Sequence, residues 1–188
     1  NIMVTTDTAL LIKDFLNDYI KPSVNIKEKK EKRMVFHIDS NKEVTHLIEE
    51  KIVPVVKRFL VNHPEYKLYL SADGVKSPHH YERYRNYFKE FDPIVYVYDN
   101  PWLLCKRLEK ADVVITTKLH VGIVASALGV SVLSFPNVPI KTIRFYKQIG
   151  ESNRCNPLRE VSSTEVEHML ENYFNVPITI PQDIINKA

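Results

Sequence analysis

Glycine is scarce in this chain, and its scarcity excludes several nucleotide-binding and catalytic motifs. Only four glycines occur among 188 residues: Gly74, Gly122, Gly129 and Gly150. No G-x-G-x-x-G segment follows a candidate strand, which argues against a standard dinucleotide-binding fold. The phosphate-loop NTPases are excluded because G-x-x-x-x-G-K-[ST] is absent, and no G-x-S-x-G nucleophile elbow is present.

Cysteine and long apolar runs are equally rare. Cys105 lies in a helical pattern and Cys155 in a polar loop, so the two thiols form neither a disulfide framework nor a metal cluster. Such thiols fit a reducing, cytoplasmic location. Metal-ligand spacing is also lacking for His79–His80 and for His37 with Asp39, so we expect no metal. No segment approaches the ~20 apolar residues that span a bilayer, and no signal peptide is visible.

The charge is nearly balanced. The 26 Lys and Arg residues exceed the 23 Asp and Glu residues by a net charge of +3. Much of the local excess lies in residues 27–33 (KEKKEKR), where acids alternate with bases. This pattern indicates a solvated linker and not a nucleic-acid-binding arm, so we expect no nucleic-acid partner. Because the chain begins Asn1-Ile2-Met3, we expect it to start within a larger fold.

Strands and helices alternate along the sequence. We predict continuous apolar strands over 34–38, 67–72, 94–98, 113–116 and 130–135. Amphipathic patterns predict helices over 5–20, 45–62 (kinked or divided at Pro54), 79–91, 101–110, from Lys118 to Gly129, 142–149 and 164–174. Strands that are apolar throughout belong to a parallel sheet covered on both faces. The sequence therefore predicts a doubly wound, Rossmann-like α/β domain, in which the aromatic stripe of residues 81–91 serves as core.

Polar residues follow each predicted strand, at the edge where open α/β sheets bind their ligands. They are Asp39-Ser40, Asp73-Gly74, Asp99-Asn100, Thr117-Lys118-His120 and the segment 135–141. Each aspartate also has a simpler explanation as a turn former or helix cap, which we favour.

The segment 111–129 (ADVVITTKLHVGIVASALG) carries the strongest functional signal. A buried strand runs into Thr117, and we predict Lys118 and His120 in the first turn of the next helix. The first N–H groups of a helix lack internal acceptors and attract anions. A lysine and a titratable histidine there suit a phosphate or carboxylate ligand whose reaction needs proton transfer. The alternative is a strand–helix junction with two polar residues on its rim.

Small and basic residues surround this segment. One side of this helix carries only small residues, Gly122, Ala125 and Ser126. We attribute them to close packing on the sheet and not to a ligand. Lys141, Arg144 and Arg154 follow the fifth predicted strand. They either complete a basic pocket or are surface charges.

The block from Ala111 to Gly150 resembles the polysaccharide pyruvyl transferase family. The resemblance rests on T-K-L-H-V-G-I-V-A-S-A-L-G-V-S-V-L-S-F, on Lys141 and on F-Y-K-Q-I-G at 145–150. The family has an Arg-Leu-His motif after a strand, a helix ending in Leu-Gly-Val, an apolar strand and then a lysine. Here Lys118 takes the place of the arginine, and Val121 stands where many members have a small residue.

The resemblance implies a two-domain GT-B architecture of which this chain is the C-terminal half. Residues 1–26 would be a helix and crossover from a missing first domain, 27–33 the charged linker, and 34–188 a single Rossmann-like domain. The family's activity implies transfer of a pyruvyl group from phosphoenolpyruvate to two hydroxyls of a sugar, in cell-surface polysaccharide synthesis. Phosphoenolpyruvate is then the donor substrate, a saccharide the acceptor, and no cofactor is needed. A lipid-linked acceptor would bring the protein to the membrane surface without a transmembrane segment.

The resemblance also assigns roles to individual residues. His120 becomes the acid/base or phosphate-contacting residue, since imidazole titrates near neutrality. The donor would be bound by five further residues: Thr117, Lys118, Leu119, Lys141 and Arg144. Lysine presents a point charge to phosphate where arginine presents a planar fork.

Two alternative functions stay open on the sequence. One is a GT-B glycosyltransferase that uses a nucleotide sugar. It requires a carboxylate for a ribose after the fourth or fifth strand, and none occurs between Thr116 and Lys141. The other is a non-catalytic domain that retains the fold.

Overall fold

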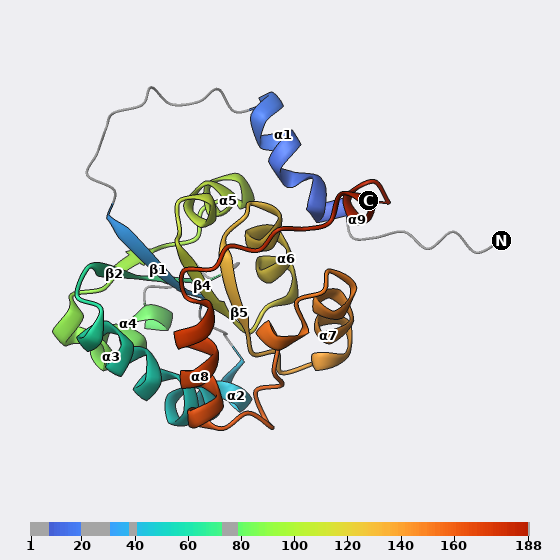
Figure 1. Cartoon of the computed structure of the whole chain (residues 1–188). Helices are drawn as coiled ribbons and strands as arrows, with labels where there is room; N and C mark the ends of the chain where they lie inside the picture. Colours follow the sequence, from blue (N-terminus) through green and yellow to red (C-terminus); the bar gives the residue numbers. More distant parts are fainter. Residues whose placement is uncertain (1–7, 20–30, 38–40, 73–78, 188) are drawn as a thin grey trace.

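Five parallel strands form the central sheet, in the order β3-β2-β1-β4-β5. Figure 1 labels four of them, β2, β1, β4 and β5. The computed structural model describes residues 8–19, 31–37, 41–72 and 79–187. The strands are β1 (Lys32–His37), β2 (Tyr66–Ser71), β3 (Ile94–Tyr96), β4 (Val113–Thr116) and β5 (Ser131–Ser134). Each neighbouring pair is parallel, as the continuous apolar strands predicted.

Helices connect the strands. They are η1 (Thr8–Leu11), α1 (Ile12–Tyr19), α2 (Lys42–Leu47), η2 (Ile48–Ile52), α3 (Val53–Asn62), α4 (His79–Tyr87), η3 (Lys89–Phe91), α5 (Pro101–Glu109), α6 (Leu119–Ala127), α7 (Pro139–Gln148), η4 (Ser152–Arg154), α8 (Ser163–Tyr173) and α9 (Gln182–Ile185).

Each face of the sheet has its own hydrophobic core. Because side chains alternate along β1, Met34 and Phe36 join one cluster, with residues of α3, α4 and α8. Val35 joins the other cluster, with residues of α5, α6 and α7. The predicted doubly wound, Rossmann-like α/β fold is therefore confirmed. The aromatic stripe of α4 also lies in the core as predicted, since Tyr81 and Tyr84 are buried.

The segment predicted as one helix over 45–62 is divided as Pro54 suggested. α2 leads into a π-helical turn, η2, and Pro54 is the second residue of α3. Proline has no N–H to donate to the preceding turn, so a wider turn before it removes the conflict.

Several element boundaries differ from those predicted, and the starts of β1 and α7 are the most informative. β1 begins at Lys32, inside the predicted 27–33 linker, because the Arg33 N–H donates to Asp112 Oδ2 (2.8 Å) and the Asp112 N–H donates to the Arg33 carbonyl (2.9 Å). Residues 27–30 lie outside the described residues. α7 begins at Pro139 and not at Thr142, since proline suits the first helical position, where no N–H is needed.

Candidate functional site

The turn between β4 and α6 has the form that the sequence indicated. The Lys118 N–H donates to Thr116 Oγ1 (3.0 Å), which bends the chain at the end of β4. Lys118 is extended (φ −99°, ψ 128°) and is the N-cap residue of α6, so it precedes the first turn and does not lie in it as predicted. Its side chain makes no capping hydrogen bond. α6 therefore begins without a side-chain cap from its N-cap residue.

Four predicted site residues share this turn, but they differ in exposure. Thr117 is buried and Leu119 is half-buried against the core below α6. Lys118 is half-buried and His120 is exposed. The ammonium and imidazole side chains are thus the groups through which this helix start can meet a ligand. The positive end of the helix dipole adds to their attraction for an anion.

The other two predicted cations lie on the neighbouring helix. α7 follows β5, the strand next to β4, so both helices start at the carboxyl edge of the sheet. Lys141 and Arg144 are exposed, whereas Phe145 and Tyr146 face the core. The structure therefore places a second pair of cations on the helix adjacent to α6.

A close contact joins α6 to α7. A Cβ atom added to Gly122 would lie 2.7 Å from the Tyr146 hydroxyl and 3.8 Å from Thr116 Cγ2. We attributed this glycine to packing on the sheet, but its nearest neighbour is a side chain of α7. The Tyr146 ring is fully buried and cannot swing aside. Gly122 thus allows α7 to approach the helix that carries His120.

On the face of the sheet that α6 covers, the last residue of each of four strands is polar. Four adjacent strands end on residues that pair in register and are all buried, namely Ser71, His37, Thr116 and Ser134. His37 Nδ1 lies 3.3 Å from Ser71 Oγ. From the sequence, His37 was considered only as a metal ligand. Its place beside Thr116 follows from the pairing of β1 with β4, which the sequence does not specify locally.

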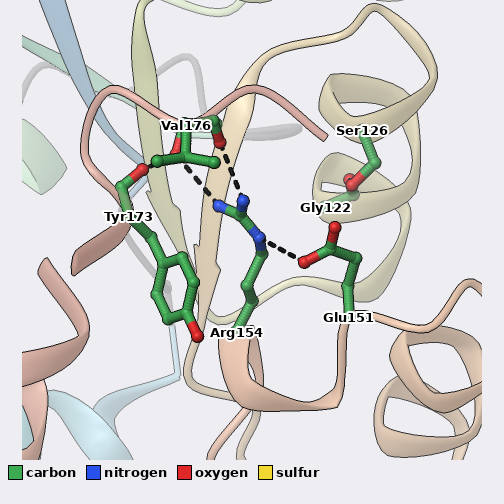
Figure 2. A network of polar contacts seen from close by, with 7 residues as sticks. Gly122, Ser126, Glu151, Arg154, Tyr173 and Val176 are labelled. Atoms are coloured by element: carbon green, nitrogen blue, oxygen red, sulfur yellow. Dashed lines mark hydrogen bonds and ion pairs between the residues drawn. The ribbon is translucent and has the colours of Figure 1, made fainter. Parts of the chain in front are cut away.

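Arg154 does not belong to a basic pocket, nor is it a surface charge. It is 1% exposed, and its guanidinium donates to Glu151 (2.6 Å), to the Val176 carbonyl (2.8 Å) and to Ser131 Oγ (3.3 Å) (Figure 2). It also lies 4.5 Å from the centre of the Tyr173 ring. Arg154 therefore joins three segments of the fold and takes no part in the site.

The remaining sequence candidates divide into two groups. Asp39, Ser40, Asp73 and Gly74 lie outside the described residues. Asn100 caps α5 by accepting the Leu103 N–H (2.9 Å), and its amide donates to Asp99 Oδ2 (2.8 Å), so the cap is made by the neighbour of the aspartate.

Cys155 has no sign of unusual reactivity. It is half-buried, and burial raises the pKa of its thiol to about 12. A thiol with so high a pKa is a poor nucleophile at neutral pH. Within the described part of the chain, no three His, Cys, Asp or Glu side chains are grouped as metal ligands.

Comparison with known proteins gives a family. A family model described as polysaccharide pyruvyl transferase matches residues 1–137, which include the β4–α6 turn. No curated protein matches the chain significantly.

Comparison with solved structures gives the fold. The UDP complex of MnaA from S. aureus superimposes with a TM-score of 0.62 at 15% identity, over 90% of this chain and 44% of that one. UDP-GlcNAc 2-epimerase from Neisseria meningitidis gives 0.60 at 10% identity, over 94% and 46%. A Thermobaculum terrenum O-GlcNAc transferase mutant gives 0.56 at 13% identity, over 80% and 29%. The chain spans less than half the length of each, and at these identities the likeness concerns the fold alone. None of its described helices is long and apolar enough to cross a membrane.

Proposed function

Because the chain belongs to the polysaccharide pyruvyl transferase family, a family of transferases that modify polysaccharides, we propose that the start of α6 binds phosphoenolpyruvate and that the pyruvyl group is transferred to two saccharide hydroxyls. The observation that carries this proposal is the β4–α6 turn, where an exposed His120 and a half-buried Lys118 lie together at the start of α6. Lys141 and Arg144 extend the positive charge toward α7. This arrangement suits a ligand with a phosphate and a carboxylate.

The chemistry needs proton transfer at more than one step. Protonation of the enol CH₂ makes C2 electrophilic, one saccharide hydroxyl forms a C–O bond to it, and the bond from C2 to the phosphate oxygen breaks. A second hydroxyl then closes the cyclic ketal. Of the two hydroxyl protons lost, one balances the new methyl group and the other leaves with phosphate. In this proposal His120 gives and takes these protons, as imidazole can near neutral pH.

The cations have a separate task in this proposal. Charge builds up on the phosphate as it leaves, and Lys118, Lys141 and the N–H groups of α6 oppose that charge. Lys118 binds one oxygen at a time, where an arginine would bind two in a fixed plane. We expect Lys118→Arg to retain donor binding and Lys118→Ala to weaken it.

We extend the proposal to the acceptor and its location. The acceptor is a saccharide, the remainder of the active site is supplied by a further N-terminal domain, and no cofactor takes part.

The two cysteines, free in the described structure, suit a cytoplasmic setting. Exposed Val138 and Ile140 precede Lys141, a combination that suits contact with an anionic membrane surface carrying a lipid-linked acceptor.

Calorimetry with the full-length protein at low salt tests the proposed donor. We expect saturable binding of phosphoenolpyruvate that weakens at least tenfold in His120→Ala, with an unchanged melting temperature because His120 is exposed. His46→Ala, which removes another exposed histidine, serves as the control. MnaA of S. aureus was solved with UDP, so a uridine diphosphate sugar is the competing ligand. Binding of that sugar without binding of phosphoenolpyruvate would favour a glycosyltransferase.

A further inference from the structure

A groove of about 690 Å³ lies between α8 and the segment formed by η4 and the residues after it. Asn153 and Asn156 line it from the first segment, and Thr164, Glu165 and His168 line it from α8. Its volume falls within the ~300–1,000 Å³ of small-molecule sites. No sequence motif marks the groove, because its two sides come from separate segments of the chain.

The lining chemistry selects a class of ligand. Among the described residues, no lysine or arginine lines the groove, and Glu165 contributes a carboxylate. Phosphoenolpyruvate or a nucleoside diphosphate would meet the Glu165 carboxylate there, and the nearby Lys51 ammonium already donates to the carbonyls of Leu158 and Arg159. Amides, a hydroxyl and an imidazole beside the buried Met169 and the half-buried Tyr173 instead suit a neutral polyhydroxyl compound with apolar C–H faces.

Several of these side chains are already positioned. Glu165 Oε2 accepts from the Ser162 N–H (2.8 Å) and hydroxyl (2.7 Å), which fixes the carboxylate at the start of α8. On the opposite side, Arg154 lies 4.5 Å from the centre of the Tyr173 ring. Groups held in place lose little freedom when a ligand binds.

The groove begins close to the proposed donor site. The Asn156 N–H donates to the Ser134 carbonyl (3.0 Å), and Ser134 pairs in register with Thr116, the residue that starts the β4–α6 turn. Two strand spacings therefore separate Asn156 from Thr116, or about 10 Å. A saccharide of several units can occupy the groove while its end reaches that turn.

We infer that this groove is a saccharide-binding subsite that holds the acceptor chain beside the donor site. The assignment rests on the proposed function for the identity of the acceptor. The groove itself binds saccharide through Asn153, Asn156 and His168, with no contribution from the cations of α6 and α7.

The test applies the full-length protein to an array of bacterial polysaccharides and hexose oligosaccharides of two to six units. The variant carries Asn153→Ala and His168→Ala, two exposed positions in the groove. The matched control carries Asn86→Ala and His46→Ala, exposed residues of the same types that do not line it. Calorimetry with phosphoenolpyruvate is run on all three proteins.

We expect the wild type and the control to bind the same saccharides and the groove variant to lose at least tenfold in affinity. Phosphoenolpyruvate affinity and melting temperature should be unchanged in the groove variant. Saccharide binding that survives in this variant, or no binding by the wild type, overturns the inference. If saccharide binds through the groove but phosphoenolpyruvate does not bind, the proposed donor is wrong and the groove assignment stands.

Discussion

The contact between Gly122 and Tyr146 is the residue-scale feature with the most direct consequence for the site. Alanine is normally better than glycine within a helix by about 1 kcal/mol. Here the added methyl group would lie 2.7 Å from a fully buried hydroxyl. We expect Gly122→Ala to lower the free energy of unfolding by about 1–3 kcal/mol, measured by urea denaturation.

Removing the oxygen should relieve this clash. The next atom of the ring, Tyr146 Cζ, lies 3.7 Å from the added carbon, which is an ordinary contact. The Tyr146 hydroxyl has no hydrogen-bond partner within the described part of the chain. Tyr146→Phe alone should therefore change stability little, and the double variant should be more stable than Gly122→Ala. Strictly additive effects would contradict this explanation.

Arg154 provides a second prediction at this scale. It is buried and bound to a carboxylate, a carbonyl and a hydroxyl, so Arg154→Ala leaves Glu151 and the Val176 carbonyl without their partner. We expect a loss of about 3–5 kcal/mol in thermal or urea unfolding. Arg58→Ala is the control, because the Arg58–Glu167 pair is exposed and should contribute less than about 1 kcal/mol. Equal losses in the two variants would mean that burial of Arg154 adds nothing.

Among the elements, α8 is stabilised at its start by a capping box. The Ser162 hydroxyl accepts the Glu165 N–H (3.2 Å), and the Glu165 carboxylate accepts the Ser162 N–H. We expect Ser162→Ala to cost about 1 kcal/mol in urea denaturation. Ser163→Ala, one position into the helix, should cost clearly less. A similar loss in both variants would show that the serine at the cap has no special role.

The same box makes stability depend on pH. The N–H and hydroxyl of Ser162 lower the pKa of Glu165, so the folded state favours the ionised carboxylate. This contribution is present above the ordinary carboxyl pKa and is lost as pH falls through the lowered one. Glu165→Gln should therefore lower the melting temperature at pH 7, and the difference from wild type should close as pH falls through the lowered pKa of Glu165. A difference that grows in acid would contradict this sign.

Elements whose signal is local were predictable from sequence. β4 has the predicted bounds 113–116, because four apolar or β-branched residues end at a polar turn. The start of α7 was missed because Pro139 was assigned to a loop, although proline also suits a helix start. Arg154 was misjudged because arginine is usually exposed, and its burial depends on Ser131 and Val176, which lie 23 and 22 residues away.

The site was predictable to a similar extent. Thr117 to His120 follow one strand, so their shared turn could be inferred from sequence. The place of His37 beside Thr116 depends on strand order, and no local pattern specifies that order. The groove along α8 likewise depends on how residues 152–156 pack against α8.

Across the whole molecule, the two proposed binding regions differ in charge. The proposed donor site has Lys118, Lys141 and Arg144 as its cations, whereas the described residues that line the groove along α8 include none. Salt screens exposed charges, with a Debye length that falls from about 30 Å at 0.01 M to about 8 Å at 0.15 M. We expect phosphoenolpyruvate affinity to fall several-fold across this range and saccharide affinity to stay the same. Calorimetry with each ligand checks this, and equal salt dependence would place both ligands in one electrostatic environment.

The outer side of β5 is occupied by the chain itself. Near its carboxyl end, the Asn156 N–H donates to the Ser134 carbonyl, and near its amino end the Ile178 N–H donates to the Val130 carbonyl. Unpaired edge strands recruit strands from other molecules. On this side the protein shields its own edge, and the opposite edge, β3, has only three residues. Self-association by continuation of the sheet is therefore disfavoured at both ends, so this domain can be concentrated with little risk of cross-molecular strand pairing.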